Sequence, residues 1–278
     1  SGLANAILRR VSESNAPPVE GLELPEWLET RLNVFWAPSV VAEFARASAT
    51  EPARVGRHRS SDASGGNAVE GVRGAYILEP GPVDEGYHIQ DSASIAVGNL
   101  VRAEPGMTVL DVAAAPGGKT SHLLDQVGPG GTVVASDIHA RRVESSRSRA
   151  PGALWVVSDG RRPPFRPSSF DRILVDAPCT GLGTLRRRPE ILYRVGLEDV
   201  ERMAVVQRQI LEATIPLLKD DGELIYSVCT VTPEETIGVV SGLGFSDPSG
   251  PGEPVDGGRL MAPHSTGSDG MFFARYRN

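Results

Sequence analysis

Apolar and polar positions along the chain follow two patterns, one typical of amphipathic helices and one of short buried strands. Before Asp91, helical spacing occurs over residues 3–12, from Pro25 onward and over residues 38–48. After Asp91, β-branched and apolar runs alternate with helical stretches. The predicted strands are 108–112, 132–136, 153–158, 172–176, 223–228 and 270–276, and the predicted helices are 91–102, 118–127, 140–149, 197–219 and one starting at Pro233. This alternation predicts right-handed βαβ units and an α/β fold with a mostly parallel sheet.

Two segments follow neither pattern and are rich in turn-forming residues. Residues 51–70 are polar and contain the run Ala63-Ser64-Gly65-Gly66-Asn67, which predicts a flexible loop. Residues 245–270 are rich in Gly, Pro, Ser and Asp, and they separate the last predicted helix from the last strand.

Length and composition exclude several classes of protein. A chain of 278 residues with 40% hydrophobic residues can build one large domain, or one domain and a smaller one. It has no apolar run long enough to span a membrane, and its N-terminus lacks the layout of a signal peptide. The two cysteines then predict free thiols in a reducing cytoplasm. The five histidines are scattered and no Cys/His cluster has zinc spacing, so we expect no structural metal.

The net charge of −7 argues against a nucleic-acid-binding protein, but the charges are segregated. Residues 137–194 hold twelve arginines and six acids, which gives +6 there and leaves −13 for the rest of the chain. Such a distribution is compatible with a phosphate-binding face, and equally with a solvated arginine-rich surface.

Both cysteines follow apolar strand runs, Arg172–Cys179 and Glu223–Cys229. Ligands of open α/β sheets bind outside the carboxyl ends of the strands, so two thiols at that edge suggest paired sulfur chemistry. The alternative is that each cysteine is a small buried hydrophobic residue, as most free cysteines are.

The turn after the first long strand predicts a cofactor site at a helix N-terminus. It reads Ala113-Ala114-Ala115-Pro116-Gly117-Gly118-Lys119-Thr120, which differs from a nucleotide-triphosphate loop because Ala113 stands at the first glycine position. S-adenosylmethionine fits better, since Asp137 lies 26 residues beyond Asp111 and could hold ribose hydroxyls. Two further acids, Asp159 and Asp176, follow the next two predicted strands. A single acid at a strand end is often a helix cap, but capping does not readily explain three acids at successive strand ends.

Five segments together resemble the RNA (cytosine-C5)-methyltransferases, specifically the bacterial 16S ribosomal RNA group called RsmB, Fmu or Sun. They are 86–94 (GYHIQDSAS), 113–120, 176–190 (DAPCTGLGTLRRRPE), 227–235 (SVCTVTPEE) and 269–274 (DGMFFA). The resemblance covers residues 86–278 and implies a class I S-adenosylmethionine-dependent methyltransferase, with a Rossmann-like, doubly wound sheet of seven strands.

The resemblance also implies a role for each matching residue. Cys229 would be the nucleophile that adds to C6 of cytosine, and Cys179 would assist proton removal and release. Asp176 would hydrogen-bond the cytosine edge, with Lys119 in the same pocket. The cofactor would lie on the turn of Ala113, Ala114, Ala115, Pro116, Gly117, Gly118 and Lys119, near Asp176, with Asp137 on its ribose and Asp159 on its adenine. The arginines expected to contact RNA phosphates are Arg186, Arg187 and Arg188.

The sequence differs from the family pattern at several single positions and in its N-terminal region. Val228, Ala113 and Thr236 stand where the family commonly has Thr, Cys and Asn. Residues 1–15 resemble only the last helix of a NusB-like domain, which indicates a fragment or a paralogue with another RNA target. We expect residues 16–85 to form a small α+β RNA-binding subdomain, with its flexible loop at about 51–70, and residues 86–278 to form the catalytic domain.

The sequence therefore predicts a monomeric, cytoplasmic enzyme with S-adenosylmethionine as cofactor, RNA with an unstacked target base as partner, and no membrane contact. Three alternatives remain open at this point. They are a DNA cytosine-C5 methyltransferase, in which Cys179 would be the nucleophile, a P-loop NTPase, and a non-catalytic RNA-binding factor of ribosome assembly.

Overall fold

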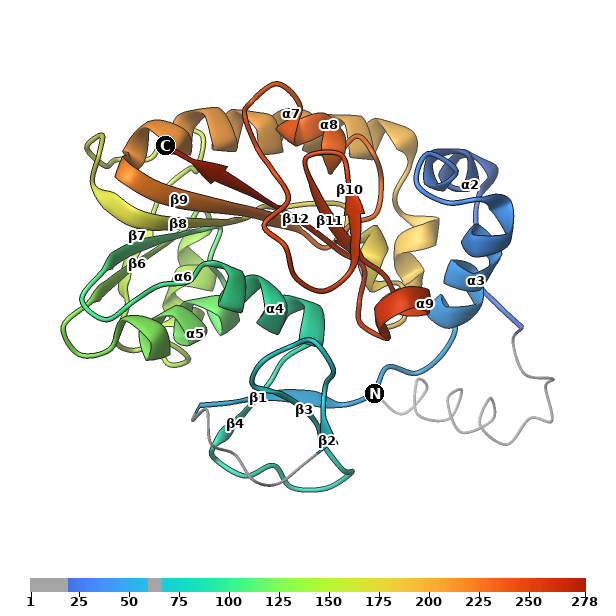
Figure 1. The fold of residues 1–278 in the computed structure, drawn as a ribbon, viewed down its shortest axis with the longest axis horizontal. Coiled ribbons are helices and arrows are strands. Elements are labelled where there is room, and N and C mark those ends of the chain that lie inside the picture. Colours follow the sequence, from blue (N-terminus) through green and yellow to red (C-terminus); the bar gives the residue numbers. More distant parts are fainter. Residues whose placement is uncertain (1–19, 60–66) are drawn as a thin grey trace.

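A computed structural model describes residues 20–59 and 67–278, and the helix predicted over residues 3–12 lies outside them. A twisted sheet of eight strands runs through the molecule in the order β10-β11-β12-β9-β8-β5-β6-β7 (Figure 1). Five of these strands are parallel to one another: β5 (Thr108–Val112), β6 (Thr132–Asp137), β7 (Leu154–Val157), β8 (Phe170–Asp176) and β9 (Leu218–Val228). The predicted α/β class with a mostly parallel sheet is therefore confirmed.

The strand order reverses between β5 and β8, which places a crevice at their carboxyl ends. From β5 the chain continues to β6 and β7 on one side, and then crosses to β8 and β9 on the other. Open α/β sheets bind their ligands at such a reversal, because the loops leaving the two central strands diverge there. The turn after β5 and the segment after β8 both open at this point.

The far end of the sheet differs from the expectation. Residues 245–270 contain two antiparallel strands, β10 (Glu253–Val255) and β11 (Gly258–Met261), followed by β12 (Met271–Arg277) against β9. The sheet thus has eight strands instead of seven. Pairing with the exposed edge of β12 supplies the backbone hydrogen bonds, so these strands form in a segment whose composition favours turns.

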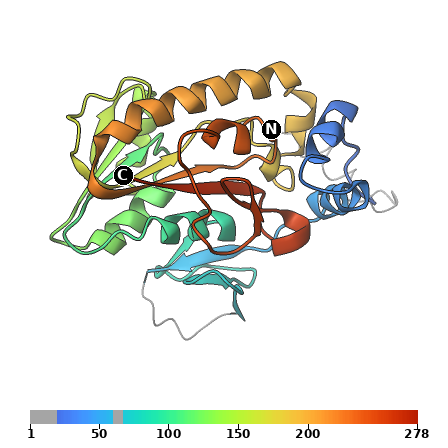
Figure 2. The same cartoon turned by 45° about the horizontal axis from the view of Figure 1, so that its top comes forward.

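Helices cover both faces of the sheet, with α7 lying along one face in Figure 2. One buried core joins α2, α3, α7 and α8 to the sheet, and a second joins α4, α5 and α6 to it. The α-helices are α2 (Glu26–Leu32), α3 (Pro38–Ser48), α4 (Ser92–Leu100), α5 (Gly118–Val127), α6 (Ala140–Ser146), α7 (Leu197–Thr214), α8 (Ile237–Val240) and α9 (Pro263–Thr266). No helix within the described residues is long and apolar enough to cross a membrane.

Several predicted helices are shorter than the pattern suggested. The helix predicted over 197–219 stops at Thr214, and a 3-10 turn over Ile215–Leu217 leads directly into β9. Pro216 lies in that turn and cannot continue an α-helix, because it lacks the required N–H. The helix expected from Pro233 is reduced to the four residues of α8, and the predicted helix 140–149 ends as α6 at Ser146.

A second, four-stranded sheet lies beneath α4, in the order β2-β3-β1-β4 (Figure 1). Its strands are β1 (Val55–His58), β2 (Asn67–Ala68), β3 (Ala75–Ile77) and β4 (Tyr87–Ile89). The prediction of a loop over residues 51–70 is therefore wrong for the residues of β1 and β2. Antiparallel pairing of these strands with β3 and β4 orders them. Since β4 belongs to this sheet, the small sheet extends past residue 85.

Candidate active site

The two cysteines meet at the carboxyl ends of the neighbouring parallel strands β8 and β9. Asp176 at the end of β8 is in register with Ser227 of β9, so Cys179 and Cys229 leave the sheet side by side. Their sulfur atoms are 3.3 Å apart, both thiols are free, and both side chains are partly buried. The structure thus brings together the two thiols that the sequence placed after separate strands.

The thiol pair is chemically asymmetric. A hydrogen bond from Cys179 lowers the pKa of Cys229, and the Lys119 ammonium acts in the same direction against the effect of burial. The same hydrogen bond and burial raise the pKa of Cys179 well above its ordinary value. Because the thiolate is the nucleophilic form of cysteine, this arrangement favours Cys229 as nucleophile and keeps Cys179 protonated.

Lys119 and Asp176 form an ion pair beside the thiols. Lys119 Nζ lies 2.7 Å from Asp176 Oδ2, and Ser227 Oγ donates to Asp176 Oδ1 at 2.8 Å. Burial alone would lower the pKa of Lys119, but the Asp176 carboxylate outweighs it and raises this pKa, so the lysine stays charged. The site therefore holds a fixed cation and a fixed carboxylate within reach of the same ligand.

Glu235 connects the two cysteine loops, and the sequence did not assign it a role. Its carboxylate is fully buried and accepts hydrogen bonds from the Thr180 amide (2.9 Å) and the Thr230 hydroxyl (3.1 Å), the residues that directly follow Cys179 and Cys229. Gln207 Nε2 on α7 and Thr232 Oγ1 donate to it as well. Two adjacent acids, Glu234 and Glu235, after the second cysteine were the available signal, although spacing could not show which of them is buried or which loops it joins.

Replacing Glu235 by alanine should lower the free energy of unfolding by about 3 kcal/mol or more, because buried donors of Thr180, Thr230 and Gln207 would lose their acceptor. The neighbouring Glu234 is the matched control, since it pairs with Arg31 at a partly exposed site (2.8 Å). Its alanine variant should cost less than about 1 kcal/mol. Urea denaturation of both variants measures the difference, and equal losses would contradict the role given to Glu235.

The turn between β5 and α5 presents its backbone to the crevice. Ala113 has φ of +58°, and Gly117, the residue before α5, has φ of +93°. A side chain at Gly117 would be strained by this φ and would meet the Trp155 ring at 3.3 Å, so a glycine is required. Thr120 Oγ1 donates to the buried Asp111 at 2.6 Å and fixes the first turn of α5 to β5.

A pocket of about 210 Å³ lies beside this turn, and Asp137 and Asp159 both line it. Asp137 is 2% exposed, and its Oδ1 accepts from the His139 amide at 2.9 Å. Its Oδ2 has no hydrogen-bond partner, although the Arg142 guanidinium lies 3.4 Å away. Asp159 is paired with Arg161 at 2.7 Å, and apolar walls come from Ile138, Val206 and Ile210.

These features fit the nucleoside part of S-adenosylmethionine. The unsatisfied Asp137 Oδ2 can accept a hydrogen bond from a ribose hydroxyl, and the apolar walls suit an adenine ring. When bound, the cofactor supplies an electrophilic methyl group. Within the described residues, no three His, Cys, Asp or Glu side chains are grouped so that they could hold a metal ion.

The three arginines expected to contact RNA differ in their surroundings. Arg187 is paired with Asp91 (3.0 Å) and Asp269 (2.8 Å), so it ties the start of α4 to the loop before β12. Arg186 donates to the Gly267 carbonyl at 3.0 Å. Arg188 is 62% exposed, with Glu190 at 3.5 Å. Of the three, Arg188 is the most available to a phosphate, and RNA contact by these arginines stays a prediction.

Comparison with known proteins identifies the family. The model of the 16S rRNA methyltransferase RsmB/F family matches residues 99–277. The ribosomal RNA small subunit methyltransferase B of Thermus thermophilus is 36% identical over 293 aligned positions, which cover 100% of this chain and 71% of that protein. The Pseudomonas putida protein of the same name is 30% identical, over 99% of this chain and 72% of its own length.

Solved structures give the same result. The crystal structure of PH0851 superposes with a TM-score of 0.81 and 25% identity, over 97% of this chain and 71% of that one. NSun6 from Pyrococcus horikoshii, solved with the S-adenosylmethionine analogue SFG, has a TM-score of 0.64 and 28% identity, over 75% and 60% of the two chains. The resemblance predicted from the motifs is confirmed, and the P-loop NTPase is ruled out. The chain belongs to the 16S rRNA methyltransferase RsmB/F family and is an S-adenosylmethionine-dependent RNA methyltransferase.

Proposed function

We propose that this protein methylates C5 of a cytosine in 16S ribosomal RNA through a covalent adduct between Cys229 and C6 of the base. The observation that carries the proposal is the thiol pair, in which Cys229 lies 3.3 Å from Cys179 and has its pKa lowered by Cys179 and Lys119. C5 of cytosine is a poor nucleophile. An ordinary methyl transfer would need neither a second thiol nor a stabilised thiolate.

The steps follow from the positions of the side chains. The Cys229 thiolate forms a bond to C6, and the electron pair of the C5–C6 double bond makes C5 nucleophilic toward the methyl group. Asp176, held by Lys119 and Ser227, lies beside the thiols and can hydrogen-bond the protonated N3 edge of the adduct. Methyl transfer to C5 would break the bond between the methyl group and the cofactor sulfonium, with S-adenosylhomocysteine as the leaving group. The C5 proton then passes to a water molecule, its electron pair restores the C5–C6 double bond, and the C6–S bond breaks to return the Cys229 thiolate. Cys179 assists this elimination, since its protonated thiol lies 3.3 Å from Cys229 and can donate a hydrogen bond to the leaving sulfur.

The relatives' names support small-subunit ribosomal RNA as the substrate. The target base must leave its stack to reach partly buried thiols, which favours a single-stranded or looped site. A monomeric state and a cytoplasmic location stay predictions.

The test uses purified protein, labelled S-adenosylmethionine and unmodified 16S ribosomal RNA, followed by digestion to nucleosides and mass spectrometry. Labelled 5-methylcytidine is expected. Label at any other nucleoside, or none on RNA when the cofactor binds, would overturn the proposal.

Replacing Lys119 by methionine should move the acidic limb of the kcat/KM profile to higher pH. Lys119 lowers the pKa of Cys229, so its removal raises that pKa and leaves less thiolate at any pH below it. Lys219, which pairs with Asp171 at 2.9 Å at the start of β9, provides the matched control. Lys219→Met should leave the profile in place, and an unshifted limb in Lys119→Met would show that the lysine does not act on the nucleophile.

A further inference from the structure

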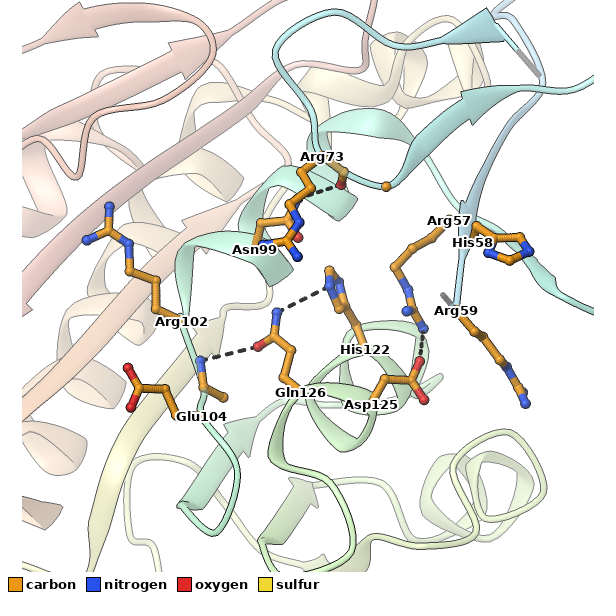
Figure 3. A pocket seen from close by; sticks show the side chains of 12 residues that line it. Arg57, His58, Arg59, Arg73, Asn99, Arg102, Glu104, His122, Asp125 and Gln126 are labelled. Carbon is orange, nitrogen blue, oxygen red and sulfur yellow. Dashed lines mark hydrogen bonds and ion pairs between the residues drawn. The ribbon is translucent and has the colours of Figure 1, made fainter. Parts of the chain in front are cut away.

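A basic cleft of about 620 Å³ lies between the small sheet and the C-terminal ends of α4 and α5 (Figure 3). Its arginines come from separate elements: Arg57 and Arg59 from β1 and the residue after it, Arg73 from the turn before β3, and Arg102 from the end of α4. The acids that line the cleft are Asp125 and Glu104, so four arginines and two acids give it a net positive charge. The chain as a whole has a net charge of −7.

The basic cleft is distinct from the active site. Asp125 and Gln126, in its floor, lie in the last turn of α5, whereas the cofactor turn leads into the first turn of that helix at Gly118. Seven residues of α-helix separate the two ends by about 10 Å. None of the residues that line the cofactor pocket also lines the basic cleft.

Two arginines of the cleft have free guanidinium groups. Arg73 and Arg102 are exposed, and within residues 20–59 and 67–278 neither guanidinium has a hydrogen-bond or ion-pair partner. Their backbones are nevertheless fixed, since Asn99 Nδ2 on α4 donates to the Arg73 carbonyl at 2.9 Å. Arg102 follows Val101, the C-cap residue of α4, and its amide donates to the Asn99 carbonyl at 3.3 Å. Two anchored cations without partners are suited to bind an anion.

The interior of the cleft also contains polar atoms that lack partners. Arg57 is 3% exposed and pairs with Asp125 at 2.7 Å, but its Nε has no hydrogen-bond acceptor. His122 is 5% exposed, its Nδ1 has no partner, and burial together with Arg57 lowers its pKa to about 3. The imidazole is therefore neutral, and the charge of the cleft comes from its arginines at any pH near neutrality. These atoms have almost no accessible surface, so the groups that a ligand in the cleft can reach are the exposed arginines.

The geometry points to the phosphate backbone of the RNA substrate as that ligand: we propose that the basic cleft binds RNA phosphates at a distance from the methylated cytosine. Guanidinium groups match phosphate oxygens in a bidentate manner, and several of them around one cleft suit a chain of phosphates. The proposal rests on the proposed function, because it assigns the cleft to the same RNA. Contacts of this kind position the RNA and carry no sequence choice.

The test compares two double variants of equal charge change. Arg73→Ala/Arg102→Ala removes the two free arginines of the cleft, and Arg46→Ala/Arg202→Ala removes two exposed arginines that lie outside both the cleft and the arginine-rich segment 137–194. RNA affinity is measured by fluorescence anisotropy over a salt series with 16S ribosomal RNA fragments. The cleft variant should bind more weakly, with a slope of log affinity against log salt smaller by about 2, one for each lost phosphate contact.

Methylation kinetics provide the second measurement. KM for RNA should rise in the cleft variant while kcat stays unchanged, because the active site is intact and only binding is lost. Equal changes in the cleft and control variants, or an unchanged salt slope in the cleft variant, would overturn the proposal. The salt slope needs no turnover, so a protein that forms no 5-methylcytidine would refute the proposed function and still give a result for the cleft.

Discussion

Replacing Cys229 by alanine should abolish methyl transfer to RNA while cofactor binding is kept. Without the thiolate no bond forms to C6, and C5 of cytosine remains unreactive toward the methyl group. Loss of a covalent nucleophile costs on the order of 10⁴-fold or more in rate. Labelled S-adenosylmethionine with 16S ribosomal RNA measures the rate, and calorimetry with the cofactor measures binding, since Cys229 does not line the cofactor pocket.

The Cys229→Ser variant is a control for packing, because its hydroxyl fills the same space and is far less acidic. It should be as inactive as the alanine variant. If Cys229→Ala turns over at a wild-type rate and Cys179→Ala does not, the roles of the two thiols are reversed, as the DNA-type alternative requires.

Replacing Cys179 by alanine should trap the enzyme on its RNA. Cys229 would still form the bond to C6, but the group beside the leaving sulfur would be absent, so elimination would stall after methyl transfer. The expected product is a protein–RNA complex that survives denaturing gel electrophoresis, in an amount approaching that of the enzyme.

The double variant Cys179→Ala/Cys229→Ala separates a covalent from a tight non-covalent complex. It should give no complex on the denaturing gel, because the attacking sulfur is gone. Free turnover by Cys179→Ala, with no accumulated complex, would refute the role of Cys179 in release.

The pattern of the sequence determined the central sheet closely. Strand 108–112 and helix 118–127 are found at the predicted bounds, and β6 and β7 differ from prediction by one or two residues. Buried parallel strands consist of continuous apolar runs and the helices between them have a strong 3.6-residue period, so local sequence suffices for both. The same reasoning placed both thiols at one edge, because β8 and β9 are parallel and end together.

Only the tertiary structure decided the features that depend on distant partners. The small sheet and β10–β11 form because other strands offer backbone hydrogen bonds, which turn-rich sequences do not reveal. Arg187 pairs with Asp91 and Asp269, two acids far from it in the chain, and no local pattern predicts these ion pairs. Glu235 joins the two cysteine loops because Thr180 and Thr230, which are far apart in the chain, both donate to its carboxylate in the folded protein. Residue spacing reflects the periodicity of each helix and strand, whereas the partner of a buried charge is set by packing between elements. The sequence therefore determined the strands and the positions of the two thiols, but not the hydrogen-bond network around Glu235 that holds the two cysteine loops together.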